Sequence, residues 1–389
     1  MTKFPYRQLS EIIETVSVRG HQVKTEAYDD GEGWPIVDQG QDLICGYTNR
    51  VEPIDCELPV TVFGDHTRET KFIDFPFVAG ADGTKVLRGD NVDPRYFHAL
   101  IEMAAEEITS LGYARHYKLI SEFDSPFTDD LQEQQRIGSV LQGWDKGVDH
   151  AERLVACHNR RLEWIIRQVL SGEVRLPSYS KPWVKTSLAD VLVEHNLQST
   201  GREVVHSVSV HRGLINQVEH LGRSFAAAST EHYNRVRPGD IVYTKSPTGD
   251  FPLGVVKQST INCDAIVSPL YGVFAPSNRS LGVILDALFS IPAISLRYLS
   301  PLVQKGAKNT ISVTNSQFLQ GKIPLPTDEA EFEELANLII AQRALIAGAE
   351  QELSHLRKQR QGLMRDLTSG VRRVPKTVES FAQRPKVSS

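Results

Sequence analysis

Residues 126–177 read PFTDDLQEQQRIGSVLQGWDKGVDHAERLVACHNRRLEWIIRQVLSGEVRLP, and much of this stretch returns 198 positions later without a gap. The identical positions include Pro126 and Pro324, Glu133 and Glu331, Glu152 and Glu350, Gly172 and Gly370, and Pro177 and Pro375. A long ungapped copy indicates that the chain contains one structural unit twice.

Apolar residues within this stretch follow an alternating spacing of four and three positions. Positions 137, 141, 144, 148, 151, 155, 158, 162, 165 and 169 read Ile, Leu, Trp, Val, Ala, Val, His, Leu, Ile and Val, and the second copy keeps eight apolar residues at the same ten places. A period of 3.5 residues buries its apolar side only against another helix. We therefore predict two helices, near 130–170 and 328–368, that pair as an antiparallel coiled coil about 60 Å long. An ordinary helical hairpin is the alternative.

Length and composition fit a soluble protein of two or three domains. The chain has 389 residues, of which 40% are hydrophobic and 23% charged, as in ordinary globular domains. No run of residues is long and apolar enough to span a membrane, and the first residues lack an apolar signal core. We expect a cytoplasmic protein without membrane contact, whose four scattered cysteines are reduced and mostly buried.

The charge of the chain is unevenly distributed. A net charge of −5 and a pI near 6.2 argue against a protein that binds nucleic acid by charge alone. Nine carboxylates lie between Glu26 and Glu57, where Arg50 is the only cation, whereas nine cations lie between Arg357 and Lys386. The basic stretch predicts either phosphate contacts or a solvated helix end with a disordered tail.

Short apolar runs separated by Gly, Pro and Asn predict strands on either side of the first repeat. The expected strands lie at 35–37, 42–47, 59–64, 71–75, 204–210, 241–243, 253–256 and 265–267, and the expected shorter helices lie at 97–111 and 281–289. The fold class is therefore α+β, with two globular units that alternate with two long helices in a pseudo-twofold arrangement. The predicted domains are 1–123, the central helix 124–177, 178–322, the distal helix 323–376, and a disordered tail 377–389.

The sequence contains few signs of catalysis. It has no Gly-x-Gly-x-x-Gly after a strand, no phosphate-binding loop, and no carboxylates paired for acid and base roles. The run Asp65-His66-Thr67 is compatible with a metal or nucleophile element, although a turn with Asp and His as backbone caps is favoured. We expect no catalytic residue and no metal site.

Across nearly its whole length the chain resembles the specificity subunit of a type I restriction-modification system. The resemblance rests on two helix entries, Pro126-Phe127 with Glu133-Gln134 and Pro324-Leu325 with Glu331, and on the exits Gly172 to Arg175 and Gly370 to Arg372. The segments 45–49, 62–65 and 238–242 are also similar to recognition domains of that family. The second copy departs from the pattern, with Phe332 where the first has Gln134.

The resemblance implies a non-catalytic subunit that reads a bipartite, asymmetric target in double-stranded DNA. The two globular units would be target recognition domains, and the helices would dock two methyltransferase subunits through Glu133, Gln134, Glu331 and Phe332. Restriction and translocation subunits would join for cleavage. The chain itself would need no cofactor, because the methyltransferase would use S-adenosylmethionine and the restriction subunit ATP and Mg.

Sequence is read by polar side chains at base edges, while cations on phosphates fix the register. The DNA-contacting residues predicted for the two units are His66, Thr67, Arg68, Lys71, Lys85, Arg88, Arg115, His116 and Lys118, and Arg202, His211, Arg212, Lys245, Lys257, Lys305, Lys308 and Asn309. Two other classes of function stay open: a coiled-coil adaptor that binds no DNA, and an enzyme that works at Asp65 and His66.

Overall fold

The computed structural model describes residues 3–109, 112, 114–217, 230–305 and 311–377. They divide into a first unit, Met1–Glu152 with Gln351–Ser389, and a second unit, Arg153–Glu350. The long helices are α3 (Leu131–Trp164), which continues as a π-helical turn over Ile165–Val169, and α8 (Glu329–Thr368). Both were predicted from the heptad spacing, and both pass from one unit into the other.

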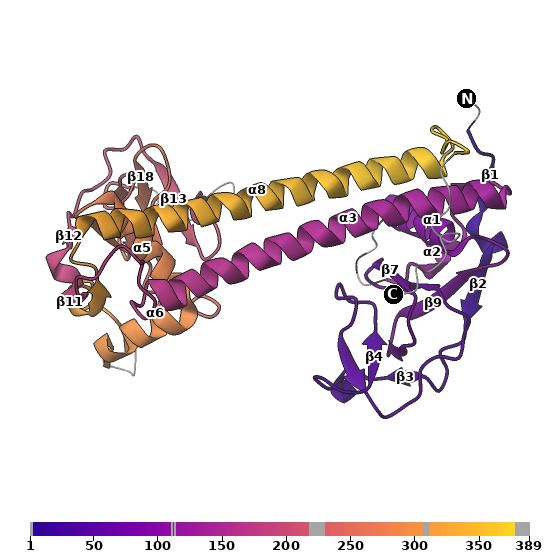
Figure 1. Ribbon diagram of the computed structural model, residues 1–389, viewed down its shortest axis with the longest axis horizontal. Helices are drawn as coiled ribbons and strands as arrows, with labels where there is room; N and C mark the ends of the chain where they lie inside the picture. Colours follow the sequence, from indigo (N-terminus) through magenta and orange to yellow (C-terminus); the bar gives the residue numbers. More distant parts are fainter. Residues whose placement is uncertain (1–2, 110–111, 113, 218–229, 306–310, 378–389) are drawn as a thin grey trace. The chain divides into compact units, whose positions relative to one another are not determined.

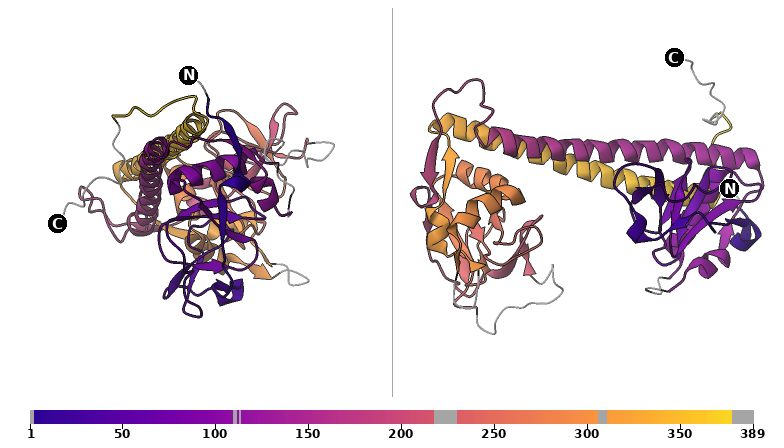
Figure 2. Two further views of the ribbon diagram at one scale, coloured as in Figure 1. Left: turned by 90° about the vertical axis from the view of Figure 1, so that its right-hand side faces the viewer. Right: turned by 90° about the horizontal axis from the view of Figure 1, so that it is seen from below.

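Within each unit α3 and α8 lie side by side (Figures 1 and 2). All ten heptad positions of each copy are buried or half-buried, whereas most neighbouring positions are exposed. The polar interruptions also find partners across the pair, since Gln342 Nε2 donates to the backbone oxygen of His158 at 2.9 Å. Arg360 Nε donates to Asp145 Oδ1, also at 2.9 Å. These contacts confirm the predicted antiparallel coiled coil.

The globular part of the first unit is built from short strands and two short helices. Its elements are β1 (Tyr6–Gln8), β2 (Ile13–Val16), β3 (Gln22–Val23), β4 (Trp34–Val37), β5 (Gly46–Thr48), β6 (Val60–Gly64), β7 (Thr70–Ile73), β8 (Val78–Gly80), β9 (Thr84–Gly89), α1 (Pro94–Glu107), α2 (Tyr117–Ser121) and β10 (Asp124–Pro126). The strand expected at 42–47 is shorter than predicted, because only β5 pairs with β4.

The second unit has a comparable set of elements. They are β11 (Val184–Ser187), β12 (Leu192–Glu194), β13 (Val204–Ser209), β14 (Gly213–Asn216), β15 (Asn234–Val236), β16 (Ile241–Tyr243), β17 (Val256–Gln258), β18 (Ala265–Val267), β19 (Gly272–Pro276), α5 (Arg279–Phe289), α6 (Pro292–Leu299), β20 (Gln304–Lys305), β21 (Ile311–Ser312), α7 (Asn315–Gln320) and β22 (Lys322–Leu325).

One sheet has the same strand order in both units. The order is β2-β9-β6-β7 in the first and β12-β19-β16-β17 in the second, with every neighbour antiparallel. In each unit the helix that follows the second strand of this order, α1 or α5, starts at a polar cap. Asp93 accepts from the backbone N–H groups of Arg95 and Tyr96, and Asn278 accepts from that of Leu281. The internal repeat therefore includes the sheets as well as the helices.

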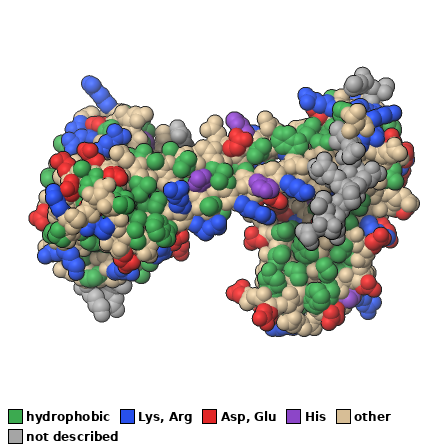
Figure 3. Space-filling view, in the orientation of Figure 1, with side chains coloured by type: hydrophobic (Ala, Val, Ile, Leu, Met, Phe, Trp, Pro, Cys, Tyr) green, Lys and Arg blue, Asp and Glu red, His purple; other side chains and the backbone are tan. Residues whose placement is uncertain are grey.

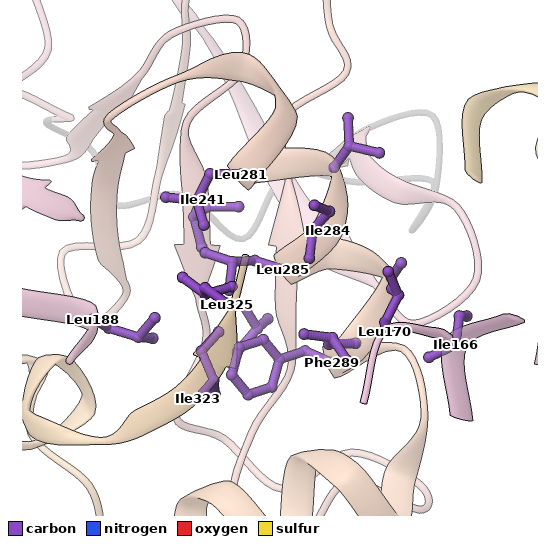
Figure 4. Packing of buried hydrophobic residues seen from close by; sticks show 14 of the residues in the cluster. Ile166, Leu170, Leu188, Ile241, Leu281, Ile284, Leu285, Phe289, Ile323 and Leu325 are labelled. Atoms are coloured by element: carbon purple, nitrogen blue, oxygen red, sulfur yellow. The ribbon is translucent and has the colours of Figure 1, made fainter. Parts of the chain in front are cut away.

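Each unit buries an apolar core that includes the ends of the long helices. In the second unit, Ile166 of the π-helical turn and Leu170 just after it lie in one buried cluster with Leu285 and Phe289 of α5 (Figure 4). In the first, α1 packs against Ile137 of α3 and Met364 of α8. The cores thus fix each globular part to the helix ends of its own unit.

Among the described helices, none is by itself long and apolar enough to cross a membrane. The neighbours α5 and α6 pass that test only together, bent by 101°, and most of α5 is buried in the core of the second unit. Of the four cysteines, Cys157 and Cys263 are exposed, so the expectation that they are mostly buried was wrong for these two.

Candidate nucleic-acid interface

Three loops of the first unit meet at Asp65, which follows β6 and is buried. Its N–H donates to the backbone oxygen of Gly83 at 2.7 Å, and its own backbone oxygen accepts from the N–H of His116 at 2.8 Å. The N–H of Tyr117 donates to Asp65 Oδ1 at 2.7 Å. Asp65 therefore holds the turn after β6, the turn before β9 and the start of α2 together, which supports the cap interpretation over a nucleophile or metal element.

Cations surround a cavity beside these loops. The cavity has a volume of about 590 Å³, and Arg19, Lys85 and Arg115 line it together with the carboxylates Asp65 and Asp82. Arg19 and Arg115 are exposed, and the amino group of Lys85 lies 5.5 Å from the centre of the Tyr117 ring. Exposed arginines on a loop cluster are the groups that contact phosphates or base edges. Lys85 and Arg115 were predicted, and Arg19 was missed because it is an isolated cation in the sequence.

Two predicted cations bind the protein's own backbone instead. Lys71 is buried and its Nζ donates to the backbone oxygens of Asp38 at 2.8 Å and Asp42 at 2.5 Å. This burial lowers the pKa of the Lys71 amino group. Arg68 Nη1 donates to the backbone oxygen of Ile108 at 2.9 Å, just after α1. The proposed interface omits Lys71 and Arg68, because a DNA contact would remove these hydrogen bonds.

Two further predicted residues of the first unit are also held by neighbours. His116 is fully buried, with its Nδ1 3.0 Å from the backbone oxygen of Asp65. Arg88 forms ion pairs with Glu14 at 2.6 Å and Glu57 at 3.4 Å. Both residues have structural contacts within the unit, and neither lines the cavity beside Asp65.

The remaining three predicted residues of this unit lie close to the loop cluster or beyond it. His66 Nδ1 lies 3.3 Å from the backbone oxygen of Ala114, and Thr67 Oγ1 donates to the backbone oxygen of Gln39 at 2.6 Å. Lys118 is exposed and pairs with Glu122 at 3.6 Å. The structure thus brings His66, Thr67, Lys85 and Arg115 together around Asp65.

Those predicted residues of the second unit that the structure describes lie on separate elements. Arg202 is exposed just before β13, while His211 and Arg212 are exposed at the turn between β13 and β14. Lys245 is half-buried with a φ of 60°, and burial lowers the pKa of its amino group. Lys257 is buried, and burial lowers the pKa of its amino group, although the negative charge of Asp286 acts in the opposite direction. The proposed interface therefore omits Lys257.

Three predicted residues remain in the second unit. Lys305 lies in β20, and Lys308 and Asn309 lie outside the described residues. Their predicted roles stay predictions.

The residues predicted to bind partner subunits instead form contacts within the chain, near the starts of α3 and α8. Glu331 is fully buried and accepts from Arg175 at 2.8 and 2.9 Å and from Trp183 Nε1 at 3.1 Å. The guanidinium carbon of Arg175 also lies 5.4 Å from the centre of the Trp183 ring. An acid at the start of α8 therefore holds the segment that leaves α3.

The first unit contains a corresponding but looser contact. Glu133, at the start of α3, pairs with Arg136 of the same helix at 2.6 Å and lies 3.8 Å from Arg373, which follows α8. The guanidinium carbon of Arg373 lies 3.9 Å from the centre of the Phe4 ring. Glu133 and Glu331, like Arg175 and Arg373, are 198 positions apart. The repeat therefore carried a signal for these ion pairs, because both members recur with the same spacing.

A partner subunit could contact these side chains directly only if their hydrogen bonds and packing within the chain were broken. Gln134 is buried as well, since its Nε2 donates to the backbone oxygen of Thr128 at 2.7 Å and its Oε1 accepts from the N–H of Asp93 at 2.9 Å. Phe332 is half-buried against the core of the second unit. The docking role of these four residues stays a prediction, and their observed contacts are intramolecular.

The fold and the site together define a protein of two α+β units on a shared helix pair, with a basic loop cluster in the first unit. No family model and no curated protein matches the chain. Among solved structures, the S subunit of a type I restriction-modification system from M. genitalium is similar, with a TM-score of 0.58 and 13% identity over 94% of this chain and 96% of that chain.

A second similar chain comes from a structure that concerns complex assembly and conformational transition of the type I R-M system. It has a TM-score of 0.50 and 14% identity, and the match covers 95% of this chain and 98% of that one. The chain thus has the fold of type I restriction-modification S subunits along nearly its whole length.

Proposed function

We propose that this chain is the specificity subunit of a type I restriction-modification system. The observation that carries the proposal is the likeness to the M. genitalium S subunit, which extends over 94% of the chain and includes both units and both long helices. Each unit would read one half of a bipartite DNA target, and the subunit itself would not catalyse a reaction.

The asymmetry of the target follows from the differences between the units. Both contain the four-stranded order described above, but the first places Arg19, Lys85 and Arg115 around Asp65, whereas the second exposes His211 and Arg212 on a hairpin. Different side chains on a shared plan would select different bases. The target would therefore be two unequal half-sites.

The helices offer surfaces for partner subunits. Leu154 and Trp164 of α3 are 50% and 52% exposed, and Ile340 and Leu345 of α8 are 44% and 49% exposed. Hydrophobic side chains are visible along the helices in Figure 3. Methyltransferase subunits would cover such residues, supply S-adenosylmethionine chemistry, and flip the target base out of the duplex. The complex, with restriction subunits that use ATP and Mg, would work in the cytoplasm.

A binding experiment tests the proposal with the chain alone and with its methyltransferase. We expect weak DNA binding and no methyl transfer by the chain alone, since its net charge is −5 and duplex binding depends on cations. With the methyltransferase, it should bind one bipartite duplex tightly. Methyl transfer by the isolated chain would contradict the proposal, and absence of DNA binding by the complex would favour the adaptor alternative.

Variants of the basic cavity sharpen this experiment. Arg19→Gln and Arg115→Gln should each weaken binding of the complex and relax the half-site that the first unit reads, because an arginine at a base edge contributes about 1–3 kcal/mol of discrimination. Lys24→Gln is the matched control, because Lys24 is an exposed cation of the same unit that does not line the cavity. Equal affinities of the Arg19, Arg115 and Lys24 variants would exclude this cavity from the interface.

The helix pair would set the distance between half-sites, which a matched deletion tests. Removal of residues 144–150 together with 342–348 takes one heptad from each helix and keeps the 4-3 spacing on both sides. The helices shorten by about 10 Å, which corresponds to about three base pairs and a rotation of roughly 100°. We expect a shorter preferred spacer or lower affinity with unchanged half-sites. Full affinity at the original spacing would exclude this role.

A further inference from the structure

The second unit contains a large cavity that the proposed function does not use. It has a volume of about 850 Å³, and its walls come from the turn before β16, the end of β17, the start of α5 and one side of α8. The cavity beside Asp65 in the first unit lies at the opposite end of the corresponding sheet, where β6 ends and β9 begins. The two cavities are therefore not equivalent positions of the repeat.

Three arginines line this cavity: Arg237, Arg279 and Arg343. Arg343 pairs with Asp286 at 2.6 Å, and Arg237 Nε lies 3.6 Å from Asp240. Arg279 is exposed and forms no ion pair within the described part of the chain. Asp240 is the one carboxylate in the lining, and its Oδ2 also lies 2.9 Å from His195 Nε2. Positive charge is thus in excess around the cavity.

The start of α5 adds to this positive field. The helix has 11 residues, its cap is the neutral Asn278, and its first turn contains no acidic residue. The first N–H groups of a helix, together with its dipole, attract anions. Because Asn278 and Arg279 both line the cavity, the positive end of α5 is part of its wall.

Ser259 adds a buried polar group to the wall of the cavity. It is 2% exposed, it lines the cavity, and its hydroxyl has no hydrogen-bond partner among the described residues. Its backbone groups are both used, since its N–H donates to Asp240 at 2.7 Å and its oxygen accepts from the N–H of Gly239 at 2.8 Å. Buried hydroxyls usually have a partner, so a ligand in the cavity would satisfy this one.

The corresponding place in the first unit lacks this excess of positive charge, so the fold itself does not require it. The corresponding cavity, between the turn before β6, the end of β9 and the start of α1, has a volume of about 270 Å³. Glu14, Glu57 and Asp90 line it, and Arg88 pairs there with both glutamates. The same place in the repeat is therefore small and acidic in one unit, and large and basic in the other.

We propose that the cavity of the second unit binds a phosphate-bearing ligand. Arg279 and the start of α5 would contact the phosphate, and the Ser259 hydroxyl would donate a hydrogen bond to it. The volume suits a small organic ligand, and Ile261, Val283 and Ile340 in the lining would pack against its less polar part. The phosphate belongs either to a free compound such as a nucleotide or to the DNA backbone. The proposal does not depend on the specificity-subunit function.

Calorimetric titration of the full chain with ATP, pyrophosphate and inorganic phosphate tests the proposal. We expect binding at or below about 1 mM, and a loss of about tenfold in Arg279→Gln, because a charge-assisted hydrogen bond is removed. Ser259→Ala should weaken binding less. Arg297→Gln is the matched control, because Arg297 is exposed on α6 outside the cavity.

A competing DNA duplex then separates the two sources of phosphate. Displacement of bound ATP by the duplex, together with weaker DNA binding in Arg279→Gln, assigns the site to backbone phosphate. Retention of ATP in the presence of duplex assigns it to a free compound. Thermal melting without ligand checks that each variant is folded. The proposal is overturned if none of the three probes binds at about 1 mM, or if the Arg279 and Ser259 variants bind as the wild type does.

Discussion

The two units attach their globular parts to the long helices in different ways. In the first, Arg360 of α8 binds Glu102 of α1 and Asp145 of α3, and Arg365 of α8 pairs with Glu106 at 2.9 Å. In the second, an ion pair from Arg343 of α8 to Asp286 of α5 accompanies the apolar cluster of Figure 4. Between the short helix and α8, the contact thus has two ion pairs to α1 in the first unit and one to α5 in the second, among the described residues.

The repeat makes this difference informative. Position 145 is Asp in the first copy and its counterpart 343 is Arg, while position 162 is Leu and its counterpart 360 is Arg. The backbone plan and the ion pairs at the helix ends have been kept, but the side chains that join helix and globular part have changed sign or polarity. We infer that the heptad spacing and the end contacts define the fold, and that the attachments tolerate different chemistry.

The largest expected effect is on the helix pair that both units share. Leu353→Asp places a carboxylate at a heptad position that is 9% exposed, and an unpaired buried charge costs about 4 kcal/mol of unfolding free energy. Chemical denaturation measures the loss. Leu345→Asp is the matched control, since Leu345 lies on the same helix but is 49% exposed. Equal stability of the two variants would refute the coiled coil.

The ion pairs at the helix ends should differ in strength between the units. Glu331→Ala leaves Arg175 without its bidentate partner, at a cost of about 3 kcal/mol. Glu133→Ala should cost less, because its closest partner Arg136, at 2.6 Å, keeps Asp130 at 4.0 Å, and Arg373 lies 3.8 Å away with its side chain 37% exposed. Denaturation of both variants gives the comparison. A larger loss in the Glu133 variant would contradict the ranking.

The charged attachment of the first unit should make the chain sensitive to acid. Burial, with the positive charge of Arg360 as a second cause, lowers the pKa of His98 from 6.5 to about 4. Folded His98 stays neutral where the unfolded residue binds a proton, so stability falls as the pH decreases from about 6.5 to about 4, by about 3 kcal/mol at most. His98→Gln should flatten this part of the melting profile. An unchanged profile would exclude His98 as its cause.

The smallest effect concerns the attachment itself. Arg360→Leu copies the residue at position 162 of the other repeat and leaves Glu102 and Asp145 without their cation, at a cost of about 2 kcal/mol. Combining it with Glu102→Gln should recover part of the loss, because the uncompensated charge is removed. Lys358→Leu is the exposed control. Strict additivity of the two changes would show that Arg360 and Glu102 are not coupled.

The sequence predicted the helices well because their signal is local and periodic. The helices expected near 130–170 and 328–368 are α3 with its π-helical turn and α8, and the polar heptad residues His158 and Gln342 meet each other. The strands 241–243 and 265–267 were also predicted correctly, since each is a short apolar run between turns.

The candidate site was harder to predict because it depends on contacts between distant segments. Lys71 and Arg115 each lie three positions from another cation in the sequence, yet Lys71 is buried on the backbone oxygens of Asp38 and Asp42, whereas Arg115 lines the cavity. Lys71 differs from Arg115 because the loop 38–42 lies against β7 and supplies acceptors for its amino group, which the sequence does not reveal. Likewise, no local pattern brings Arg373 to Phe4, although the repeat of both acid and arginine indicated a paired role.

The central claim is that the two units read two separate half-sites, and selection of bound sequences from a random DNA pool tests it most directly. The wild-type chain with its methyltransferase should select two specified half-sites with an unspecified spacer. The double variant Arg19→Gln, Arg115→Gln, which changes only the first unit, should relax one half-site and leave the other unchanged. One continuous site, or loss of preference in both halves, would contradict the account.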